Sequence, residues 1–472
     1  MRRGQFPLSN LPAWCMLNNI TFTGVKATDT EAQGLGLIAE NDLDGKNDEL
    51  PPLLTIPKEL ILSAAGVEEY AKENKDFRQL LNAAGRQSLR GDILLFLLTQ
   101  LVLSSPDYSG GQGASTAWTQ YFKLLPTQVP VPTLWSESEL SLLRGTSLES
   151  AISAKLGALT REFNRLQDAT TSLARWNELI EVNESITLRD WILLDALYRS
   201  RSLDLPGSGE SMVPCLDLVN HSNPATAYFE ENPEGGVVLL LRKEANVLGQ
   251  SEITIDYGHD KSAAEMLFSY GFIDPTSTAK SIVLPVESME DDPLAKAKLY
   301  AFGCTPSLKI TDSDTGIPRW DAPFVHLMCL NHEDGLQFKV LQETDGSHDL
   351  RMFWQDTDVT AEAGHIESII KTHDLCQVFR LRAVVVVLGT IQQQLTLLAA
   401  AHNEERGATG NERPHVAQAA SQLRAVEKDL LERTSQSLEE EKLRLFEDES
   451  VMTYLATVNG AQQHEDDEED FT

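Results

Sequence analysis

The pattern of apolar and polar positions changes twice along the chain. Residues 34–40 and 50–57 predict short strands, because glycine flanks the first and the apolar run of the second reaches a proline. From about residue 58 to residue 200 the pattern is helical, and its apolar run 93–103 predicts a buried helix. A two-residue period returns over residues 213–258. A helical insertion therefore interrupts one β domain.

Local signals mark the elements inside these regions. Ser136-x-x-Glu139 and Thr187-x-x-Asp190 are capping boxes, which predict that helices begin there. In the second β region, residues 227–231 and 237–241 flank an Asn-Pro-Glu-Gly-Gly sequence. Two such runs around turn-forming residues predict a hairpin.

Helix-forming sequence dominates from about residue 290 onward. Before it, residues 281–286 allow one more strand, and residues 415–446 predict long amphipathic helices. The acidic run 465–470 has no apolar residue, so we expect it to be disordered. At 472 residues the chain is too long for one ordinary core. The expected fold is α+β in three parts: the β domain with its helical insertion at about 58–200, covering residues 1–275; a mainly helical domain, 276–460; and an acidic disordered tail, 461–472.

The net charge of −32, from 71 acidic and 39 basic residues, narrows the class of partner. Phosphate contacts need a cationic face, so nucleic acid is disfavoured and a basic protein or peptide fits better. An acidity that serves only solubility stays open as the alternative. The sequence does not define an oligomer, and we expect a monomer.

The spacing of the cysteines and the lengths of the apolar runs indicate the cellular compartment. The five cysteines form no CxC or CxxC pair, so neither a disulfide framework nor a zinc cluster is predicted, and a reducing compartment is implied. No apolar run of signal-peptide length follows the N-terminal arginines. The longest apolar runs, 93–103 and 383–388, are too short to span a bilayer. We expect a soluble protein of the cytoplasm, the nucleus or both, with no membrane partner.

One apolar segment ends in two polar side chains. Residues 212–219 are apolar enough to be buried, yet Asn220 and His221 follow directly. A core tolerates an amide and an imidazole only when they are hydrogen-bonded. Nearby backbone would satisfy an isolated pair, so the significance of this one depends on the other motifs in the chain.

Four other short motifs accompany Asn220-His221 in a definite order. They are the glycine-rich segment 33–39, Ser200-Arg201, the segment 253–258 that ends in Tyr257-Gly258, and 270–272, which reads Tyr-Gly-Phe. In this order and spacing they resemble the SET-domain protein methyltransferases, within them the Rubisco-lysine-methyltransferase-like class. The resemblance covers residues 15 to 275 well. It implies a split SET-type β domain, a helical C-terminal domain that helps to dock substrate, and S-adenosylmethionine (SAM) as cofactor, with S-adenosylhomocysteine (SAH) as product.

The segment around Tyr257 can also be interpreted from its period. Ile253, Ile255 and Tyr257 share one face of the predicted strand, so the tyrosine should point inward. A capping box at Ser262-x-x-Glu265 then predicts a helix that ends at Gly271 and carries Tyr270. Both tyrosines could instead be packing residues. The resemblance favours a role for both in the site.

The resemblance implies a role for each motif. Tyr257 directs its hydroxyl at the transferring methyl group, and backbone around Asn220-His221 holds adenine. Arg201 can pair with the cofactor carboxylate, and Asp217 orients its segment. Gly34 and Gly36 let backbone approach the methionine end closely. The expected cofactor residues are Gln33, Gly34, Leu35, Gly36, Ser200, Arg201, Asp217, Asn220, His221 and Tyr257; the expected substrate channel is Tyr228, Tyr270 and Leu203.

Two departures from the family pattern concern the cofactor. Ala263 follows Lys261-Ser262 where many members carry asparagine, and Gln33 stands where many carry arginine. A metal role or general-base role for His221 is not indicated, because no second ligand stands at metal spacing and amine methylation needs no metal.

The sequence thus predicts a SAM-dependent methyltransferase that acts on a lysine ε-amine of a non-histone protein. The substrate is expected to be basic around the target lysine. A histidine-directed methyltransferase is the alternative within the class, and Leu203 favours lysine because an imidazole would want a polar partner there. A non-catalytic binding module is the other alternative. The presence of Tyr257, Asn220 and His221 argues against it.

Overall fold

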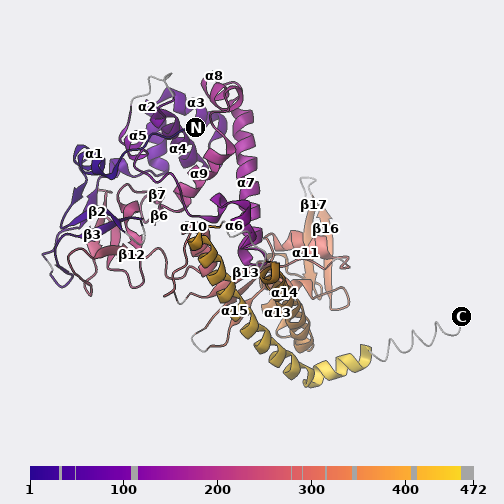
Figure 1. Cartoon of the computed structure of the whole chain (residues 1–472). Helices are drawn as coiled ribbons and strands as arrows, with labels where there is room; N and C mark the ends of the chain where they lie inside the picture. Colours follow the sequence, from indigo (N-terminus) through magenta and orange to yellow (C-terminus); the bar gives the residue numbers. More distant parts are fainter. Residues whose placement is uncertain are drawn as a thin grey trace. The chain divides into compact units, whose positions relative to one another are not determined.

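The computed structural model describes residues 1–30, 34–47, 49–107, 115–277, 279–289, 291–313, 316–342, 348–404 and 412–458. The chain forms two compact units (Figure 1). The first unit comprises Met1–Ser136, Ser150–Lys261 and Glu265–Thr278. The second comprises Glu137–Glu149, Ser262–Ala264 and Ala279–Thr472. The predicted tail and Gln33 lie outside the described residues.

The first unit contains two four-stranded sheets and two two-stranded ribbons. The sheets have the strand orders β1-β5-β10-β9 and β2-β3-β12-β8, and the ribbons are β4-β11 and β6-β7. The strands are β1 Thr21–Phe22, β2 Val25–Thr30, β3 Gly34–Ala39, β4 Leu43–Asp44, β5 Leu54–Ile56, β6 Ser202–Leu205, β7 Gly209–Met212, β8 Asn220–His221, β9 Ala227–Glu231, β10 Val237–Leu241, β11 Asn246–Val247 and β12 Glu252–Ile255.

Helices separate the early strands from the late ones along the chain, as the sequence pattern predicts. They are α2 Ala64–Glu73, α3 Lys75–Ala84, α4 Leu89–Ser104, α5 Ala117–Tyr121, α6 Glu137–Ser141, α7 Ser147–Thr170, α8 Ala174–Asn177 and α9 Leu188–Arg199. Helix α1 Leu11–Leu17 precedes the first strand, and α10 Ala263–Tyr270 follows β12. The predicted buried helix is α4, whose residues 93–102 are all buried. The Thr187-Asp190 capping box begins α9. The predicted hairpin is β9-β10, with Leu239 opposite Phe229.

The insertion brings the two β regions into shared sheets. Strand β12 pairs antiparallel with β3 and parallel with β8, so Ile253 lies opposite Leu37 and Ile255 opposite His221. Strands β3 and β12 lie side by side in Figure 1, although the helical insertion separates them in the sequence.

 Segments that are far apart in the sequence therefore meet at β12, and this junction positions the candidate site.

The second unit combines long helices with two three-stranded sheets, β13-β14-β15 and β16-β17-β18. Its helices are α11 Ala295–Phe302, α12 Pro323–Met328, α13 Ile366–Ile370, α14 Cys376–Glu404 and α15 Pro414–Phe446. Its strands are β13 Ser281–Pro285, β14 Ser307–Thr311, β15 Arg319–Asp321, β16 Leu336–Gln342, β17 His348–Trp354 and β18 Thr357–Asp358. The sequence predicted β13 and α15 but not the later strands, because β14, β15 and β18 are short and β16 and β17 bury few side chains.

Helices α14 and α15 build the main core of the second unit. Val384, Val387 and Ile391 of α14 are fully buried in the same cluster as Leu430 and Leu431 of α15. Over Cys376–Ala401, α14 is long and apolar enough to cross a bilayer by length and composition alone. Within α14 the uninterrupted apolar run is 383–388, which is why the sequence predicted no membrane span. Helices of soluble cores pass the same test, so this feature does not decide between the two environments.

Candidate active site

The glycine-rich strand and the Asn-His motif meet directly in the first unit. The Asn220 side-chain amide donates to the Leu35 carbonyl oxygen at 3.2 Å and to Glu252 Oε1 at 2.7 Å. Gly36 faces this contact, and a Cβ there would lie 2.4 Å from Glu252 Oε1 and 2.9 Å from Asn220 Nδ2. Gly34 has φ +77° and open space around it. The two glycines thus serve different needs, close packing at Gly36 and a left-handed backbone at Gly34.

Tyr257 lies two residues beyond the end of β12. The predicted strand was longer, but the Gly258 amide turns back to Asp256 Oδ1 at 2.8 Å, and Gly258 has φ +128°. The Tyr257 hydroxyl donates to the Val219 carbonyl oxygen at 2.8 Å. Burial raises the pKa of Tyr257, so the hydroxyl stays protonated at neutral pH.

Aromatic rings surround Tyr257. Its ring centroid lies 4.6 Å from that of Tyr270, 5.3 Å from that of His221 and 6.4 Å from that of Phe272. Burial also raises the pKa of Tyr270. The Lys261 ammonium donates to the Tyr257 carbonyl oxygen and lies over the Tyr270 ring, 5.9 Å from its centroid. The motifs 253–258 and 270–272 therefore come together as one cluster.

Arg201 is anchored to a buried carboxylate. Its Nη1 donates to the Asp217 carbonyl oxygen at 2.7 Å and to Asp217 Oδ2 at 3.2 Å. The other Asp217 oxygen accepts the Tyr121 hydroxyl, which itself accepts the Cys215 amide at 2.8 Å. Burial raises the pKa of Asp217, although the Arg201 charge opposes this. Asp217 thus fixes Arg201, a pairing that the sequence did not predict, and Tyr121 is a partner that sequence reasoning missed.

Arg3 is a second cation near Arg201 that sequence reasoning also missed. Its Nη2 donates to the Leu125 carbonyl oxygen. Burial, followed by the nearby Arg201 charge, lowers the pKa of Arg3 to about 10. Arg3 Nη1 and Arg201 Nε are buried and have no hydrogen-bond partner in the described part of the chain. Two neighbouring guanidinium groups with unused donors suit an anion such as a carboxylate. No motif signals Arg3, because its role depends on where the N-terminal segment folds back.

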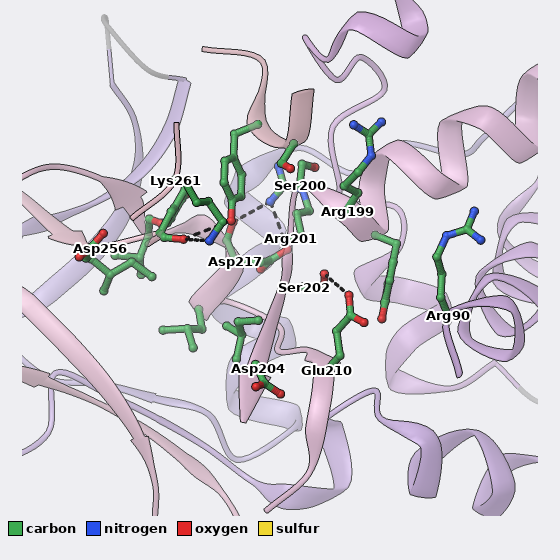
Figure 2. A pocket seen from close by; sticks show the side chains of 18 of the residues that line it. Arg90, Arg199, Ser200, Arg201, Ser202, Asp204, Glu210, Asp217, Asp256 and Lys261 are labelled. Carbon is green, nitrogen blue, oxygen red and sulfur yellow. Dashed lines mark hydrogen bonds and ion pairs between the residues drawn. The ribbon is translucent and has the colours of Figure 1, made fainter. Parts of the chain in front are cut away.

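A cavity of about 680 Å³ opens beside Tyr257 (Figure 2). Six expected site residues line it: Ser200, Arg201, Leu203, Asp217, Tyr257 and Tyr270. Gly34, Gly36, Asn220 and His221 lie outside its lining. Phe229 lines the wall where the sequence expected Tyr228, whose side chain is 39% exposed and lies under Arg242. Adjacent strand residues point to opposite faces, so a difference of one position changes the residue that meets the cavity.

The cavity extends to a charged cluster that the sequence did not indicate. Asp195 is fully buried and pairs with Arg90 at 2.6 Å and Lys155 at 2.8 Å. Burial opposes ionisation, but these cations hold the pKa of Asp195 below its usual value. Figure 2 shows Arg90 and Arg199 on one side of the view and Lys261 and Asp256 on the other. The lining is therefore polar at both ends.

Two further acidic side chains line this cavity. Asp204 and Glu210 are directly opposite each other in the β6-β7 ribbon. Like charges at such positions destabilise a ribbon, and the Glu210 carboxylate accepts a hydrogen bond from the Ser202 hydroxyl at 3.3 Å. Among the described residues, no group of three or more His, Cys, Asp or Glu side chains could hold a metal ion.

Comparison with known proteins shows which proteins this chain is similar to. No protein-family model matches the chain. SET domain-containing protein 8 of Schizosaccharomyces pombe is 29% identical over 296 residues, which cover 61% of this chain and 64% of that protein. The chloroplastic ribulose-1,5 bisphosphate carboxylase/oxygenase large subunit N-methyltransferase of Pisum sativum is 26% identical, covering 68% of this chain and 62% of that protein. The chain thus matches less than two thirds of the length of these relatives.

A more distant relative and one solved structure complete the comparison. Mouse actin-histidine N-methyltransferase is 22% identical over 345 residues. The crystal structure of the SET domain of LSMT bound to methyl-lysine and AdoHcy superposes with a TM-score of 0.67, at 20% identity, and covers 94% of both chains. The protein has the SET-domain fold. In sequence it is similar to SET-domain proteins and to protein N-methyltransferases, among them the enzyme directed at the Rubisco large subunit.

Proposed function

We propose that the protein uses SAM to methylate the ε-amine of a lysine in a non-histone protein. The observation that carries this proposal is the placement of Tyr257. Its hydroxyl is fixed on the Val219 carbonyl in the wall of a cavity that also contains Tyr270 and Arg201. A preorganised hydroxyl and carbonyl beside a cavity can orient an entering amine.

The described residues fit a bound SAM. The unused donors of Arg3 and Arg201 suit its carboxylate, while the open backbone at Gly34, the half-buried Asn220 and the buried His221 suit its other polar groups. Leu35 lines a second cavity, of about 390 Å³, with Leu125, whose carbonyl accepts Arg3. When bound, SAM supplies an electrophilic methyl group for an in-line displacement by the amine.

The cavity wall can favour the neutral form of an entering lysine, which is the form that accepts methyl. A lysine with a pKa of about 10.4 is neutral in only roughly one molecule in 2,500 at pH 7. Leu203, Phe229 and Ile255 give the wall apolar surface. Desolvation at such a wall lowers the pKa of an entering ammonium and excludes water. Tyr257 stays neutral because burial raises its pKa, so it presents a hydroxyl rather than a phenolate.

Two features support the class of substrate. Leu203 offers no polar partner to an imidazole, which favours lysine over histidine, the residue in the name of the actin-directed relative. Asp204 and Glu210 place two carboxylates on the β6-β7 side of the cavity lining, which suits a substrate that is basic around the target. We extend the proposal to a monomer of the cytoplasm or nucleus whose second unit helps to dock the substrate protein.

Transfer of label to protein tests the proposal. Purified protein is incubated with labelled SAM and a cell extract, and the labelled band and residue are identified by mass spectrometry. Tyr257→Phe should bind SAH with nearly unchanged affinity but transfer methyl about 10²-fold more slowly. Its stability should fall by about 1 kcal/mol, because one hydrogen bond to Val219 is lost.

Each alternative gives a different result. Label on histidine would contradict the lysine assignment. Measurable SAH binding by calorimetry without any transfer would favour a non-catalytic module. A wild-type rate for Tyr257→Phe would make Tyr257 a packing residue.

A further inference from the structure

The His221 ring is held between two segments that belong to different motifs. Its Nδ1 lies 3.1 Å from the Tyr257 backbone nitrogen, which donates to it. Its Nε2 lies 3.2 Å from Asp274 Oδ2. The ring is buried. His221 therefore connects Asp274, which no motif singled out, to the backbone of Tyr257.

These contacts assign the position of the imidazole proton. A ring nitrogen that accepts an N–H hydrogen bond carries no proton, so Nδ1 is unprotonated. In the neutral ring the proton is then on Nε2, where Asp274 accepts it. The other tautomer would turn an N–H of the ring against the N–H of Tyr257. Asp256 Oδ1 lies 3.9 Å from Nδ1, beyond hydrogen-bond distance, so it does not compete with the Tyr257 amide.

Asp274 is itself fixed in position. Its Oδ1 accepts from the Thr276 amide at 2.8 Å and from the Thr276 hydroxyl at 2.7 Å. That hydroxyl also lies 3.1 Å from the Asn223 carbonyl oxygen. Burial raises the pKa of Asp274, but hydrogen bonds from Thr276 and His221 more than offset this, so the net pKa is lowered. A charged carboxylate thus faces Nε2, with its second oxygen already occupied.

The bond from Tyr257 to His221 replaces a strand hydrogen bond. Strand β12 ends at Ile255, so no ladder fixes the Tyr257 amide. His221 is the partner of this amide, while Val219 holds the hydroxyl. A change of tautomer would leave the amide facing a donor, which would displace the residue or the ring.

From this geometry we propose that Asp274 is a positioning residue for Tyr257, because it holds His221 in the Nε2–H tautomer. The tautomer itself does not depend on the proposed function. The consequence for methyl transfer does depend on it.

Asp274→Asn is the sharpest perturbation, since it hardly changes volume. Thr276 presents two donors to Oδ1, so the amide oxygen should remain there and the new NH₂ group should face His221 Nε2. The ring should then shift to the Nδ1–H tautomer and the bond to Tyr257 should break. Asp274→Leu removes the acceptor at Nε2 and should weaken the preference for Nε2–H, which the Tyr257 amide alone would then support. Thr276→Val, which keeps the carboxylate, should retain it.

Nitrogen-15 NMR of full-length protein labelled on histidine measures the tautomer directly, with His221→Gln used to assign the signal. We expect Nε2 to be protonated in the wild type and in Thr276→Val, and Nδ1 in Asp274→Asn. SAH affinity from calorimetry should change less than about threefold, while single-turnover methyl transfer at saturating SAM should fall about 10- to 100-fold, the scale of a small misplacement. As a control, Asp349→Asn makes the same substitution on β17 of the second unit, where the carboxylate pairs with Arg351. This variant should match the wild type in all three measurements.

The outcomes separate the two proposals. An unchanged Nε2–H signal in Asp274→Asn and Asp274→Leu overturns the role of Asp274, whatever the activity. A changed tautomer with a wild-type transfer rate overturns the positioning of Tyr257. Absence of transfer by the wild type contradicts the proposed function alone, because the NMR signal still decides the tautomer.

Discussion

Glu427 on α15 should make the second unit less stable as pH rises. The residue is only 2% exposed. Its Oε2 accepts from the Ser147 amide at 3.0 Å, and its Oε1 accepts from the Ser147 hydroxyl. Burial raises the pKa of Glu427 from 4.5 to about 7, although Ser147 and Arg424 oppose this shift. Glu427→Gln removes the ionisation and retains a similar shape.

The sign and size of the effect follow from proton linkage. Because the folded state binds the proton more tightly than the unfolded state, the contribution of Glu427 to stability is fully present below about pH 4.5 and is lost as pH rises to about 7. At 1.36 kcal/mol per pH unit, the loss is about 3 kcal/mol. Glutamine can accept from the Ser147 amide and donate to its hydroxyl. Glu427→Gln should therefore be near neutral at pH 4.5 and stabilising by about 2–3 kcal/mol at pH 8.

Hydrogen exchange of α15 measures this difference within one unit, which avoids assuming a single unfolding transition for the chain. Wild type and Glu427→Gln are compared at the same pH, so intrinsic exchange rates cancel. Glu432→Gln is the matched control, because Glu432 is an exposed carboxylate on the same helix, paired with Lys428. The reasoning would be refuted if the difference in α15 stability between Glu427→Gln and wild type were equal at pH 5 and pH 8. It would also be refuted if the variant lost stability relative to wild type as pH rises.

Three further outcomes concern the site. Arg3→Gln should weaken SAH binding about tenfold or more in calorimetry, since a charge-assisted contact is lost, whereas unchanged affinity would remove Arg3 from the cofactor site. Tyr270→Phe should slow transfer less than Tyr257→Phe and change the number of methyl groups added, which mass spectrometry of the product reports. An unchanged rate and product distribution would contradict a channel role. A chain ending near residue 285 should still bind SAH but lose turnover on intact substrate protein, and equal activity of both forms would remove the docking role.

Strong local signals predicted the elements that carry the site. The buried run of α4 and the capping box at Thr187 depend on neighbouring residues alone, and both helices form where expected. The short strands of the second unit lack such signals. In β14 only Leu308 and Ile310 are buried, so the alternation extends over too few positions to predict a strand among helix-forming sequence.

The contacts that fix the site could not be predicted in the same way. Tyr121 meets Asp217 across 96 residues of sequence, and Arg3 reaches Leu125 across 122. Neither pair has a spacing that a periodic pattern can encode. Such contacts depend on how the insertion folds against the β strands, which only the assembled structure defines.

Phe229 and Tyr228 show that a shift of one sequence position changes which side chain faces the cavity. A motif match assigns a position along the chain, but the pairing of β9 with β10 decides which of two adjacent side chains faces the cavity. Leu240 lies opposite Tyr228, and the buried Leu239 lies opposite Phe229, so the face that carries Phe229 is the one turned inward. An aromatic residue therefore remains on the wall, but it lacks the hydroxyl that Tyr228 would have brought. With no hydroxyl from β9, the polar groups that can orient an amine at this wall come from Tyr257 and Tyr270, which is why their two variants are expected to differ in rate and in product.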